Sequence, residues 1–478
     1  MVDLSSESRF LWKLWAKERP TQNAFITPDC TLSWSQVDAL VDAYKHQLLS
    51  QGLTRDDVLT IVGKNSPEVV MVYLAALELG VICAFTMPQP NASLKNKLDT
   101  LYPPGAQPSI AYSHHSSSQP AELALSGARP IKLSLLKDAV TDVCDVRQGL
   151  EVCDVTQLSS IIFTSGSTGN PKAVAYSLEQ HLFSAKGLLN AIHYQPSDCW
   201  LLSLPMYHVS GLAIVHRWLF VGASLKVGSG ELSSDAIGCT HASLVPTQLH
   251  RLFESKQSLS LTHVLLGGSH IPLKLALQAQ DMGIETWLGY GMTEAASTVT
   301  AKMVDETNTA GSLLPYRDLK IDQGRIFISG NTLASGYYFQ GEVITLREID
   351  GWFDSKDLGI WKNGELQIVG RVDNQFISGG ENIHCEEIER ALNAHPGVVQ
   401  AYIIPIDDTE FGQRPVAVTH TSHEISLADY QSFLDGKLEK FKWPVRYYEM
   451  PQTLMNNGIK VSRKALRDWL NEKEVQTR

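Results

Sequence analysis

The N-terminal part of the chain alternates between segments with helical spacing of apolar residues and short, continuously apolar segments. After Ser35 the apolar positions recur every three or four residues, at Val37, Leu40, Val41, Tyr44 and Leu48. Residues 57–63 have the composition of a buried strand, the pair Ser66-Pro67 favours the start of a second helix that ends at Gly80, and residues 81–85 return to a strand. This alternation predicts a mostly parallel sheet with helices on its faces.

The same alternation continues after residue 200, where short strands end in glycine-rich or polar turns. Strands are predicted at 200–204, 241–245 and 263–266, and the last of these is followed by Gly267-Gly268-Ser269. A further strand at 285–288 is followed by Gly289-Tyr290-Gly291. Turns at the carboxyl ends of strands are where open α/β sheets bind their ligands, so both glycine segments are candidate binding segments.

The pattern changes near residue 322, where short strands with frequent glycines replace the alternation of helix and strand. A hairpin over 359–369 is predicted to turn at Asn363-Gly364. A new α+β unit then begins, with helices at 385–394, after Ser426 and at 462–471 and a strand at 398–405. We therefore predict an α/β protein in which residues 1–371 form a large N-terminal domain and residues 372–478 form a small C-terminal domain.

Composition narrows the class of protein. The 478 residues are 44% hydrophobic and 19% charged, which is typical of a globular chain with more than one core. A formal charge of −11 argues against a nucleic-acid partner, and no polybasic or long apolar run indicates membrane insertion. The N-terminus lacks the basic and apolar segments of a signal peptide, so we expect a cytoplasmic protein with small-molecule substrates. The sequence leaves open whether it forms a homo-oligomer.

Two features carry no predicted chemistry. The seven cysteines are scattered without a Cys-x-x-Cys pair, which indicates free thiols and neither a disulfide framework nor a zinc site. The pair His114-His115 has no further metal-ligating residues nearby, so we expect these histidines to be exposed to solvent.

One segment has a composition suited to binding phosphate, Thr164 to Lys172, directly after the apolar run 160–163. Its glycines let backbone N–H groups converge, its hydroxyl groups donate further hydrogen bonds, and its lysine adds a positive charge. The residues concerned are Thr164, Ser165, Gly166, Ser167, Thr168, Gly169 and Lys172. The spacing differs from the P-loop G-x-x-x-x-G-K-[ST], because Asn170 and Pro171 separate the second glycine from the lysine.

This segment resembles the phosphate-binding loop of the adenylate-forming superfamily, which includes acyl-CoA synthetases, adenylation domains of peptide synthetases and beetle luciferases. The resemblance implies a distorted β-barrel subdomain in the N-terminal part, a mobile C-terminal domain, and ATP, Mg²⁺ and coenzyme A as cofactor and cosubstrates. The segment 289–294 is similar to the superfamily's second signature, which implies that Tyr290 stacks on adenine, Thr293 meets the α-phosphate and Glu294 holds Mg²⁺. The nucleotide site is also expected to include Gly267, Gly268, Ser269, Gly289 and Gly291.

Asp357 matches the superfamily's ribose-binding aspartate, since one carboxylate can accept hydrogen bonds from both ribose hydroxyls. The superfamily usually has Thr-Gly where this chain has Ser355-Lys356. Arg371 is expected to reach the ribose or the phosphate. Asp373 corresponds to the hinge between the two domains, although an ordinary linker aspartate explains that residue equally well.

The segment 457–463 resembles the superfamily's catalytic-lysine motif, with Ile459 inserted between glycine and lysine. Lys460 keeps the spacing to Arg463 and is therefore assigned as the catalytic lysine. The resemblance implies two half-reactions at one site. A substrate carboxylate first attacks the α-phosphate of ATP, while Lys460 and Mg²⁺ offset the charge and pyrophosphate leaves. The small domain then rotates and brings the Gly379-Gly380 turn to the site, where the thiol of coenzyme A attacks.

The segment 204–212 matches the superfamily's acyl-pocket motif, with His208 at the gate position; a packed histidine at a strand end is the alternative. Arg217 lies in the otherwise apolar run 213–220. A buried guanidinium needs a partner, because burying it unpaired costs several kcal/mol. Either an internal carboxylate or a ligand anion provides this partner, and a dicarboxylic acid would supply such an anion.

At closer range the chain resembles the o-succinylbenzoate–CoA ligases of menaquinone biosynthesis, in the segments 200–205, 208–211, 239–249 and 295–299. On that resemblance Arg217 and Thr298 contact the non-activated carboxylate or keto group of the substrate, with Ser210 nearby. The implied function is conversion of 2-succinylbenzoate to 2-succinylbenzoyl-CoA. The alternatives are a CoA ligase for another aryl acid such as a halobenzoate, a stand-alone adenylation domain that serves a carrier protein, and a non-catalytic nucleotide-binding module.

Overall fold

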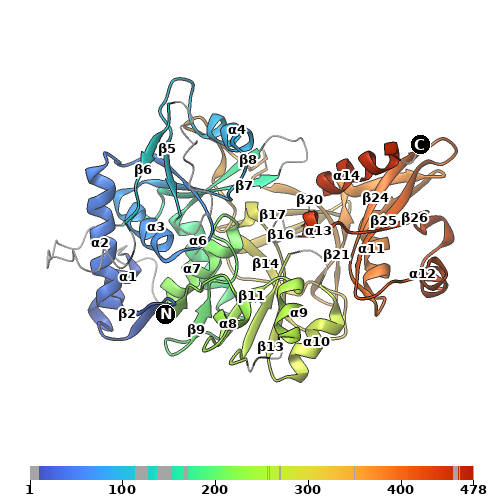
Figure 1. The fold of residues 1–478 in the computed structure, drawn as a ribbon, viewed down its shortest axis with the longest axis horizontal. Helices are drawn as coiled ribbons and strands as arrows, with labels where there is room; N and C mark the ends of the chain where they lie inside the picture. Colours follow the sequence, from blue (N-terminus) through green and yellow to red (C-terminus); the bar gives the residue numbers. More distant parts are fainter. Residues whose placement is uncertain are drawn as a thin grey trace.

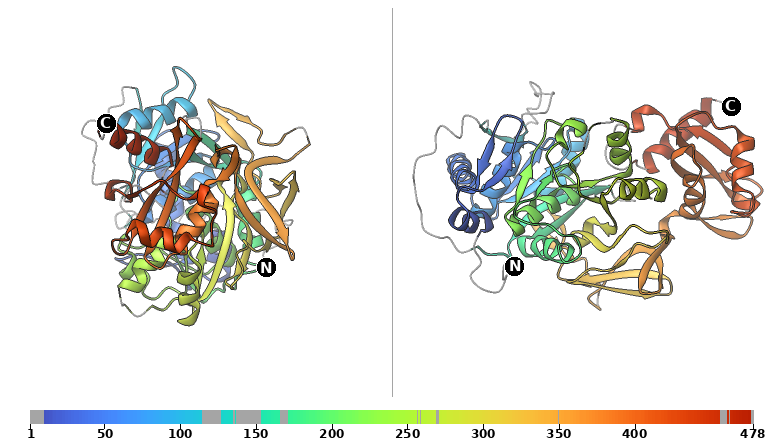
Figure 2. Two further views of the ribbon diagram at one scale, coloured as in Figure 1. Left: turned by 90° about the vertical axis from the view of Figure 1, so that its right-hand side faces the viewer. Right: turned by 90° about the horizontal axis from the view of Figure 1, so that it is seen from below.

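The computed structural model describes residues 10–113, 127–134, 136, 153–165, 171–255, 257, 259–268, 271–348, 350–455, 461 and 463–476. The C-terminal helices and strands form a separate lobe beside the larger N-terminal part, and β21 (Glu365–Arg371) leads from one into the other (Figure 1). The view from below shows the same separation (Figure 2).

The first large sheet has eight strands in the order β19-β18-β8-β7-β4-β3-β5-β6. Its strands are β3 (Val58–Val62), β4 (Ile82–Thr86), β5 (Ser109–Tyr112), β6 (Arg129–Ile131), β7 (Leu158–Ser165), β8 (Pro171–Ser177), β18 (Gly336–Phe339) and β19 (Glu342–Ile344). Strands β3 to β7 are parallel, as the alternation predicts, and β8 returns antiparallel to β7. The phosphate-binding segment therefore connects two paired strands.

Helices α1 (Leu11–Glu18), α2 (Trp34–Ser50), α3 (Pro67–Leu79), α4 (Asn91–Leu101) and α6 (Leu178–Leu188) belong to this part of the chain. The predicted cap of α3 is present, because Ser66 Oγ accepts a hydrogen bond from the N–H of Val69 at 3.3 Å. The helix ends at Gly80 with φ +69°, a left-handed conformation that favours glycine. Local sequence chemistry thus fixes both ends of this helix.

The second large sheet has nine strands in the order β15-β14-β13-β12-β11-β9-β10-β1-β2. Its strands are β1 (Asn23–Ile26), β2 (Thr31–Ser33), β9 (Cys199–Leu201), β10 (Ser224–Lys226), β11 (His241–Leu244), β12 (His263–Leu266), β13 (Glu285–Met292), β14 (Ser297–Met303) and β15 (Ser312–Leu313). Helices α7 (Val209–Val221), α8 (Leu232–Asp235), α9 (Pro246–Glu254) and α10 (Leu273–Asp281) connect its strands. Strands β9 to β13 are parallel, which places their carboxyl ends at one edge.

One prediction for this sheet is wrong in its extent. The segment Gly289-Tyr290-Gly291, expected as a turn, continues strand β13 to Met292 and pairs antiparallel with β14. A Cβ at Gly291 would lie 1.8 Å from the carbonyl oxygen of Ser297, so glycine is needed here for close approach of the two strands.

The region predicted as a distorted β-barrel contains a four-stranded antiparallel sheet of β16 (Arg317–Asp322), β17 (Arg325–Gly330), β20 (Phe353–Lys362) and β21. The predicted hairpin is confirmed: β20 and β21 are joined by Asn363 and Gly364, with φ +52° and +83°.

The C-terminal strands and helices follow the short helix η2 (Val372–Asn374), and the division into domains 1–371 and 372–478 stays a prediction. The C-terminal part contains a five-stranded sheet of β22 (Gln375–Ser378), β23 (Glu381–His384), β24 (Val398–Asp408), β25 (Gly412–Thr421) and β26 (Arg446–Glu449). Its helices are α11 (Cys385–Asn393), η3 (Lys440–Lys442), α12 (Leu427–Leu434), α13 (Gln452–Met455) and α14 (Arg463–Gln476). Two apolar clusters of this part contain only residues from Phe376 onwards, as a separate core requires.

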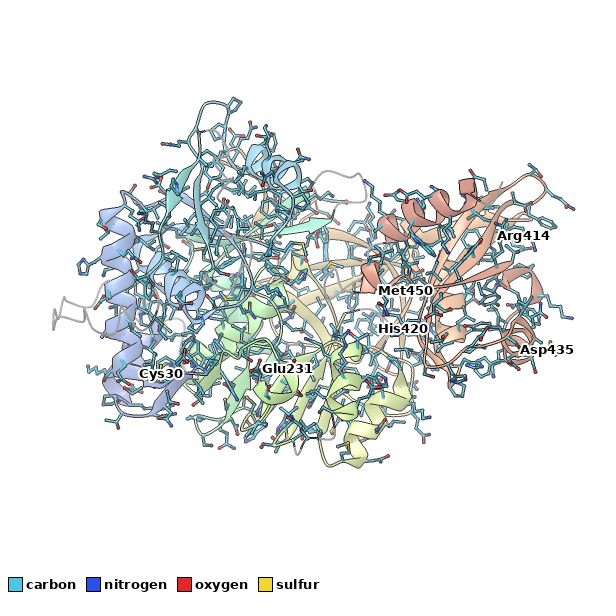
Figure 3. All side chains as sticks on the ribbon, viewed as in Figure 1. Cys30, Glu231, Arg414, His420, Asp435 and Met450 are labelled. Carbon is cyan, nitrogen blue, oxygen red and sulfur yellow. The ribbon has the colours of Figure 1, made fainter. Side chains whose placement is uncertain are left out.

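The described cysteines are free thiols, as expected: Cys30 is exposed and the others are buried. Cys30 and Glu231 lie in the N-terminal part, while Arg414, His420, Asp435 and Met450 lie in the C-terminal lobe (Figure 3). Among the described helices, none has the length and apolar character needed to cross a bilayer.

Candidate active site

Asp357 is the centre of a hydrogen-bonded group built by three elements. Its residue is 5% exposed, and its carboxylate accepts hydrogen bonds from Tyr290 Oη and from Arg371 Nη1, each at 2.6 Å. Arg371 also donates from Nε to Asp373 at 2.9 Å. Burial and the Asp357 charge raise the pKa of Tyr290 well above its ordinary value, so its hydroxyl keeps its proton. The structure thus brings together the residues predicted to bind adenine and ribose and the predicted hinge.

The structure shows how Ser355-Lys356 can occupy the position where the superfamily usually has Thr-Gly. Lys356 adopts φ +63°, a left-handed conformation that glycine adopts more easily than other residues. The ammonium of Lys356 pairs with Asp354 at 2.5 Å. Ser355 Oγ accepts a hydrogen bond from the N–H of Asp357 at 3.0 Å and donates to the carbonyl of Ile326 at 2.6 Å. These contacts hold a non-glycine residue in the turn and keep Asp357 in place.

Glu294 lies at the junction of the two large sheets. Its carboxylate accepts a hydrogen bond from Tyr337 Oη at 3.1 Å, and the ammonium of Lys172 lies 4.8 Å from the centroid of the Tyr337 ring. Thr164 pairs with Lys172 across the β7–β8 ladder. The lysine of the phosphate-binding segment and the carboxylate predicted to hold Mg²⁺ therefore contact the same tyrosine.

The Glu294 carboxylate is a suitable ligand for a magnesium ion that binds together with a nucleotide. Mg²⁺ in nucleotide sites uses one or two carboxylates together with substrate phosphates and water. The described residues include no cluster of three metal-ligating side chains, as a metal cage made by the protein alone would need. Glu294, which shares the contact with Tyr337 with Lys172, is thus compatible with a metal shared between protein and triphosphate.

Two further nucleotide-site predictions are placed at this edge. Thr293 begins the short helix η1 (Thr293–Ala295) directly after β13, and its carbonyl accepts a hydrogen bond from the hydroxyl of Tyr176 on β8. Gly267 and Gly268 follow β12, and Gly268 has φ +112°. The N–H of Gly267 donates to the carbonyl of Leu244 at 3.2 Å, at the end of the neighbouring strand.

Several predicted residues lie outside the described residues, and their roles stay predictions. They are Gly166, Ser167, Thr168 and Gly169 of the phosphate-binding segment, Ser269, the catalytic candidate Lys460, and the pair His114-His115. Gly379 and Gly380 are described; they form the exposed turn between β22 and β23, with φ +60° and +87°, and the N–H of Gly379 donates to the carbonyl of Phe411.

Arg217 is buried in helix α7, at 2% exposure. Its Nη1 donates to Ser243 Oγ at 3.1 Å, its guanidinium lies 5.0 Å from the centroid of the Trp200 ring, and its Nε has no hydrogen-bond partner. Burial lowers the pKa of Arg217 to about 9, so the group stays a cation at neutral pH. Among the described residues, no carboxylate forms an ion pair with it.

The other predicted acid-site residues come from the same helix and from β14. His208 is the N-cap of α7; burial and the charge of Lys97 lower its pKa to about 4, so it is neutral at pH 7. Ser210 lies two helical turns before Arg217, on the same face. Thr298 is buried, and a Cβ at Gly289 would lie 2.9 Å from its Cγ2. Thr298 therefore packs directly against the nucleotide-site strand.

Three contacts were not predicted from the sequence, those of Ser243, Trp200 and Tyr337. Ser243 is a polar residue near the carboxyl end of the buried strand β11, and that position is a signal that could have identified it. Trp200 and Tyr337 resemble ordinary core aromatic residues in sequence. Only their contacts with Arg217, Lys172 and Glu294 distinguish them.

Known proteins are similar to this chain over nearly its whole length. The 2-succinylbenzoate–CoA ligase of Escherichia coli (strain K12) is 39% identical over 465 residues, which cover 97% of this chain and 98% of that protein. A structure of an Escherichia coli MenE variant with bound OSB-AMS matches with a TM-score of 0.87 at 38% identity, covering 98% of this chain and 99% of that chain.

A structure of Bacillus subtilis o-succinylbenzoate coenzyme A synthetase (MenE) in complex with ATP and magnesium ion has a TM-score of 0.81 at 24% identity, covering 93% of this chain and 96% of that chain, and shows the shared fold. The AMP-binding enzyme family matches residues 12–338, which include the phosphate-binding segment, the Tyr290 to Glu294 segment and the acid-site helix. With that match over more than half of its length, the chain belongs to the AMP-binding enzyme family.

Proposed function

We propose that the chain is an ATP-dependent acid–CoA ligase that converts 2-succinylbenzoate to 2-succinylbenzoyl-CoA, a step of menaquinone biosynthesis. Full-length similarity to proteins named for this reaction supports the substrate. The observation that carries the proposal is the Arg217 guanidinium, buried with no described carboxylate to neutralise it. A dicarboxylic acid has one carboxylate to activate and a second to pair with this cation.

In the first half-reaction the acid carboxylate attacks the α-phosphate of ATP, a P–O bond forms, and pyrophosphate leaves with the bonding electrons. Tyr290 and Asp357 bind the nucleoside, and Lys172 binds the departing phosphates from the β7–β8 hairpin. Lys460 offsets charge at the α-phosphate. Mg²⁺, held by Glu294 and the phosphates, supplies further charge neutralisation when bound. The protein mainly positions the reactants and offsets charge.

In the second half-reaction the thiol of coenzyme A attacks the acyl carbonyl, a C–S bond forms, and AMP leaves. We propose that residues 372–478 move as a unit about Asp373 between the two half-reactions. The Arg371–Asp373 hydrogen bond links this hinge to the ribose carboxylate Asp357, so nucleotide binding and hinge conformation share one side chain. A cytoplasmic location stays a prediction.

Pyrophosphate exchange measured over a panel of organic acids tests the function. We expect strong preference for 2-succinylbenzoate over halobenzoates and fatty acids, followed by AMP release when coenzyme A is added. Absence of ATP consumption would leave only a nucleotide-binding module. Acceptance of a pantetheinyl carrier protein in place of coenzyme A would favour a stand-alone adenylation domain.

Arg217→Ala tests the acid site. It should raise KM for 2-succinylbenzoate, with a loss in kcat/KM equivalent to about 2–5 kcal/mol, because it removes the partner of a buried charge. For the substrate analogue that carries a methyl ester at the non-activated carboxylate, kcat/KM should fall far less. Arg251→Ala, an exposed position on α9, is the matched control. Equal losses for the diacid and its ester would count against the carboxylate role.

A further inference from the structure

A second guanidinium is buried near Arg217, that of Arg317 at the start of β16. It is 3% exposed and makes four hydrogen bonds. Nε donates to the carbonyl of Thr298 at 2.9 Å, Nη1 to the carbonyl of Pro315 at 2.7 Å, and Nη2 to the carbonyl and the hydroxyl of Ser184, each at 3.1 Å. All four acceptors are neutral, so these bonds engage each of the three guanidinium nitrogens and leave the positive charge in place.

Both cations lie where α6, α7 and β14 pack together, because Arg217 is on α7 and Arg317 binds Ser184 of α6 and Thr298 of β14. The charge of Arg317 adds to burial in lowering the pKa of Arg217. Among the described residues, no carboxylate forms an ion pair with either guanidinium. Two like charges in a region of low dielectric constant repel each other and have both lost their hydration, which costs free energy unless an anion binds beside them. Binding of an anion beside this pair is therefore favourable, because no described carboxylate neutralises the two charges.

The surroundings of Arg317 are adapted to admit it. A Cβ at Gly187, inside helix α6, would lie 1.9 Å from Arg317 Nη1 and 2.5 Å from the carbonyl oxygen of Pro315. Glycine inside a helix costs up to about 1 kcal/mol relative to alanine, so this position gives up helix stability for space. The guanidinium then joins α6 to β14 at the backbone of Thr298, a residue assigned to the acid site.

We propose that Arg317 is a positioning residue that sets the specificity for a doubly charged acid. It fixes the backbone of Thr298 and adds a second positive charge to the surroundings of Arg217. It does so without touching the substrate. The substrate class is thereby narrowed to acids that bring a second negative charge besides the reacting carboxylate. This inference rests on the proposed function, because it takes Arg217 and Thr298 as the acid site.

Arg317→Gln and Arg317→Lys separate the charge from the hydrogen bonds. The measured quantity is kcat/KM for 2-succinylbenzoate divided by kcat/KM for its monomethyl ester, in pyrophosphate exchange. We expect the glutamine variant to lower this ratio about fivefold or more, since an interaction between charges is strong away from water. The lysine variant keeps the charge and should keep the ratio within about twofold of the parent, even where its stability falls.

Arg129→Gln is the matched control, because Arg129 binds the same kinds of acceptor: the carbonyls of Gln51 and Gly52 and the hydroxyl of Ser109. Arg129 lies on β6 of the eight-stranded sheet, which does not contain Arg217, Thr298 or Arg317. The Arg129→Gln variant should therefore leave the ratio unchanged.

Equal losses for diacid and ester in Arg317→Gln would overturn the specificity role and leave Arg317 as a structural clamp. Should that variant not fold, Arg317→Lys decides: a ratio that drops more than about twofold overturns the proposal, and a preserved ratio supports it. If the parent protein shows no preference for the diacid over the ester, the proposed function fails and the inference fails with it. If the parent protein prefers the diacid and the Arg317→Gln variant has the same ratio as the parent, the inference about Arg317 is refuted while the proposed function stands.

Discussion

Asp357→Asn should damage ATP use far more than it damages the fold. The carboxylate accepts hydrogen bonds from Tyr290 and Arg371, and on nucleotide binding it is proposed to accept two more from the ribose. Hydrogen bonds to charged groups contribute about 1.5–3 kcal/mol each, against about 1 kcal/mol for neutral ones. Asparagine keeps the size and loses the charge, so we expect a loss of about 2–4 kcal/mol. This corresponds to a fall of about 30- to 1,000-fold in kcat/KM for ATP.

The assay is pyrophosphate exchange with ATP and with 2′-deoxy-ATP. The parent should discriminate against the deoxy nucleotide, because one of the two ribose hydroxyls is missing. Asp357→Asn should lose most of this discrimination, since the residue that senses the hydroxyl has lost its charge. Tyr290→Phe is the control: it removes a hydrogen bond to the Asp357 carboxylate, worth about 1.5–3 kcal/mol, but keeps the ring proposed to stack on adenine. Because the carboxylate itself remains, this variant should keep the discrimination against the deoxy nucleotide.

Discrimination that persists in Asp357→Asn would refute the ribose role. A thermal unfolding curve decides whether a loss of activity reflects the site, because Arg371 keeps its second partner, Asp373, in the variant. A fall in kcat/KM of the same size for ATP and for the acid, together with a large drop in Tm, would indicate damage to the fold.

Three further predictions use other parts of the structure. Lys356→Val should destabilise the protein by about 1–2 kcal/mol in urea unfolding, because a β-branched residue is strained at φ +63°. Lys356→Gly should cause no such strain. An equal loss of stability in both variants would exclude backbone strain as the cause. His181 is buried, and burial lowers its pKa to about 3. Between pH 6.5 and 3 the histidine therefore binds a proton in the unfolded state but not in the folded state. The free energy of unfolding falls as the pH falls through this window, by up to about 1.4 kcal/mol per pH unit. His181→Gln should make the dependence of the urea midpoint on pH shallower between pH 6.5 and 5, and an unchanged slope would contradict this assignment. Lys460→Ala should block formation of the acyl-adenylate yet largely spare thioester formation from supplied acyl-adenylate, as quenched-flow measurement of each half-reaction would show; equal loss in both would argue against domain rotation.

Features with a local cause could be predicted from the sequence. The Ser66-Pro67 start and Gly80 stop of α3 depend on a side-chain cap and a left-handed residue that lie within the helix segment itself. The Asn363-Gly364 turn depends on two residues that tolerate positive φ. Tyr290, Asp357 and Arg371, which are distant in the chain, could be named together only because their short motifs resemble a known superfamily.

The extent of β13 and the partners of Arg217 depended on tertiary structure. Gly289 to Met292 became a strand because β14 folds back and pairs with it, which local propensity does not reveal. The sequence of α7 requires that Arg217 find a partner, because a charge in an apolar helix cannot stay unpaired. It does not say that Ser243 and Trp200 surround it from β11 and β9.

The sequence by itself determined the alternation of elements, the phosphate-binding composition and the need for a counter-charge at Arg217, since each follows from residues close together in the chain. Only the tertiary structure decided that Arg317 binds the backbone of Thr298 and that its charge acts on Arg217. Such interactions depend on distance in space, and these residues come into one region only once α6, α7 and β14 are packed together.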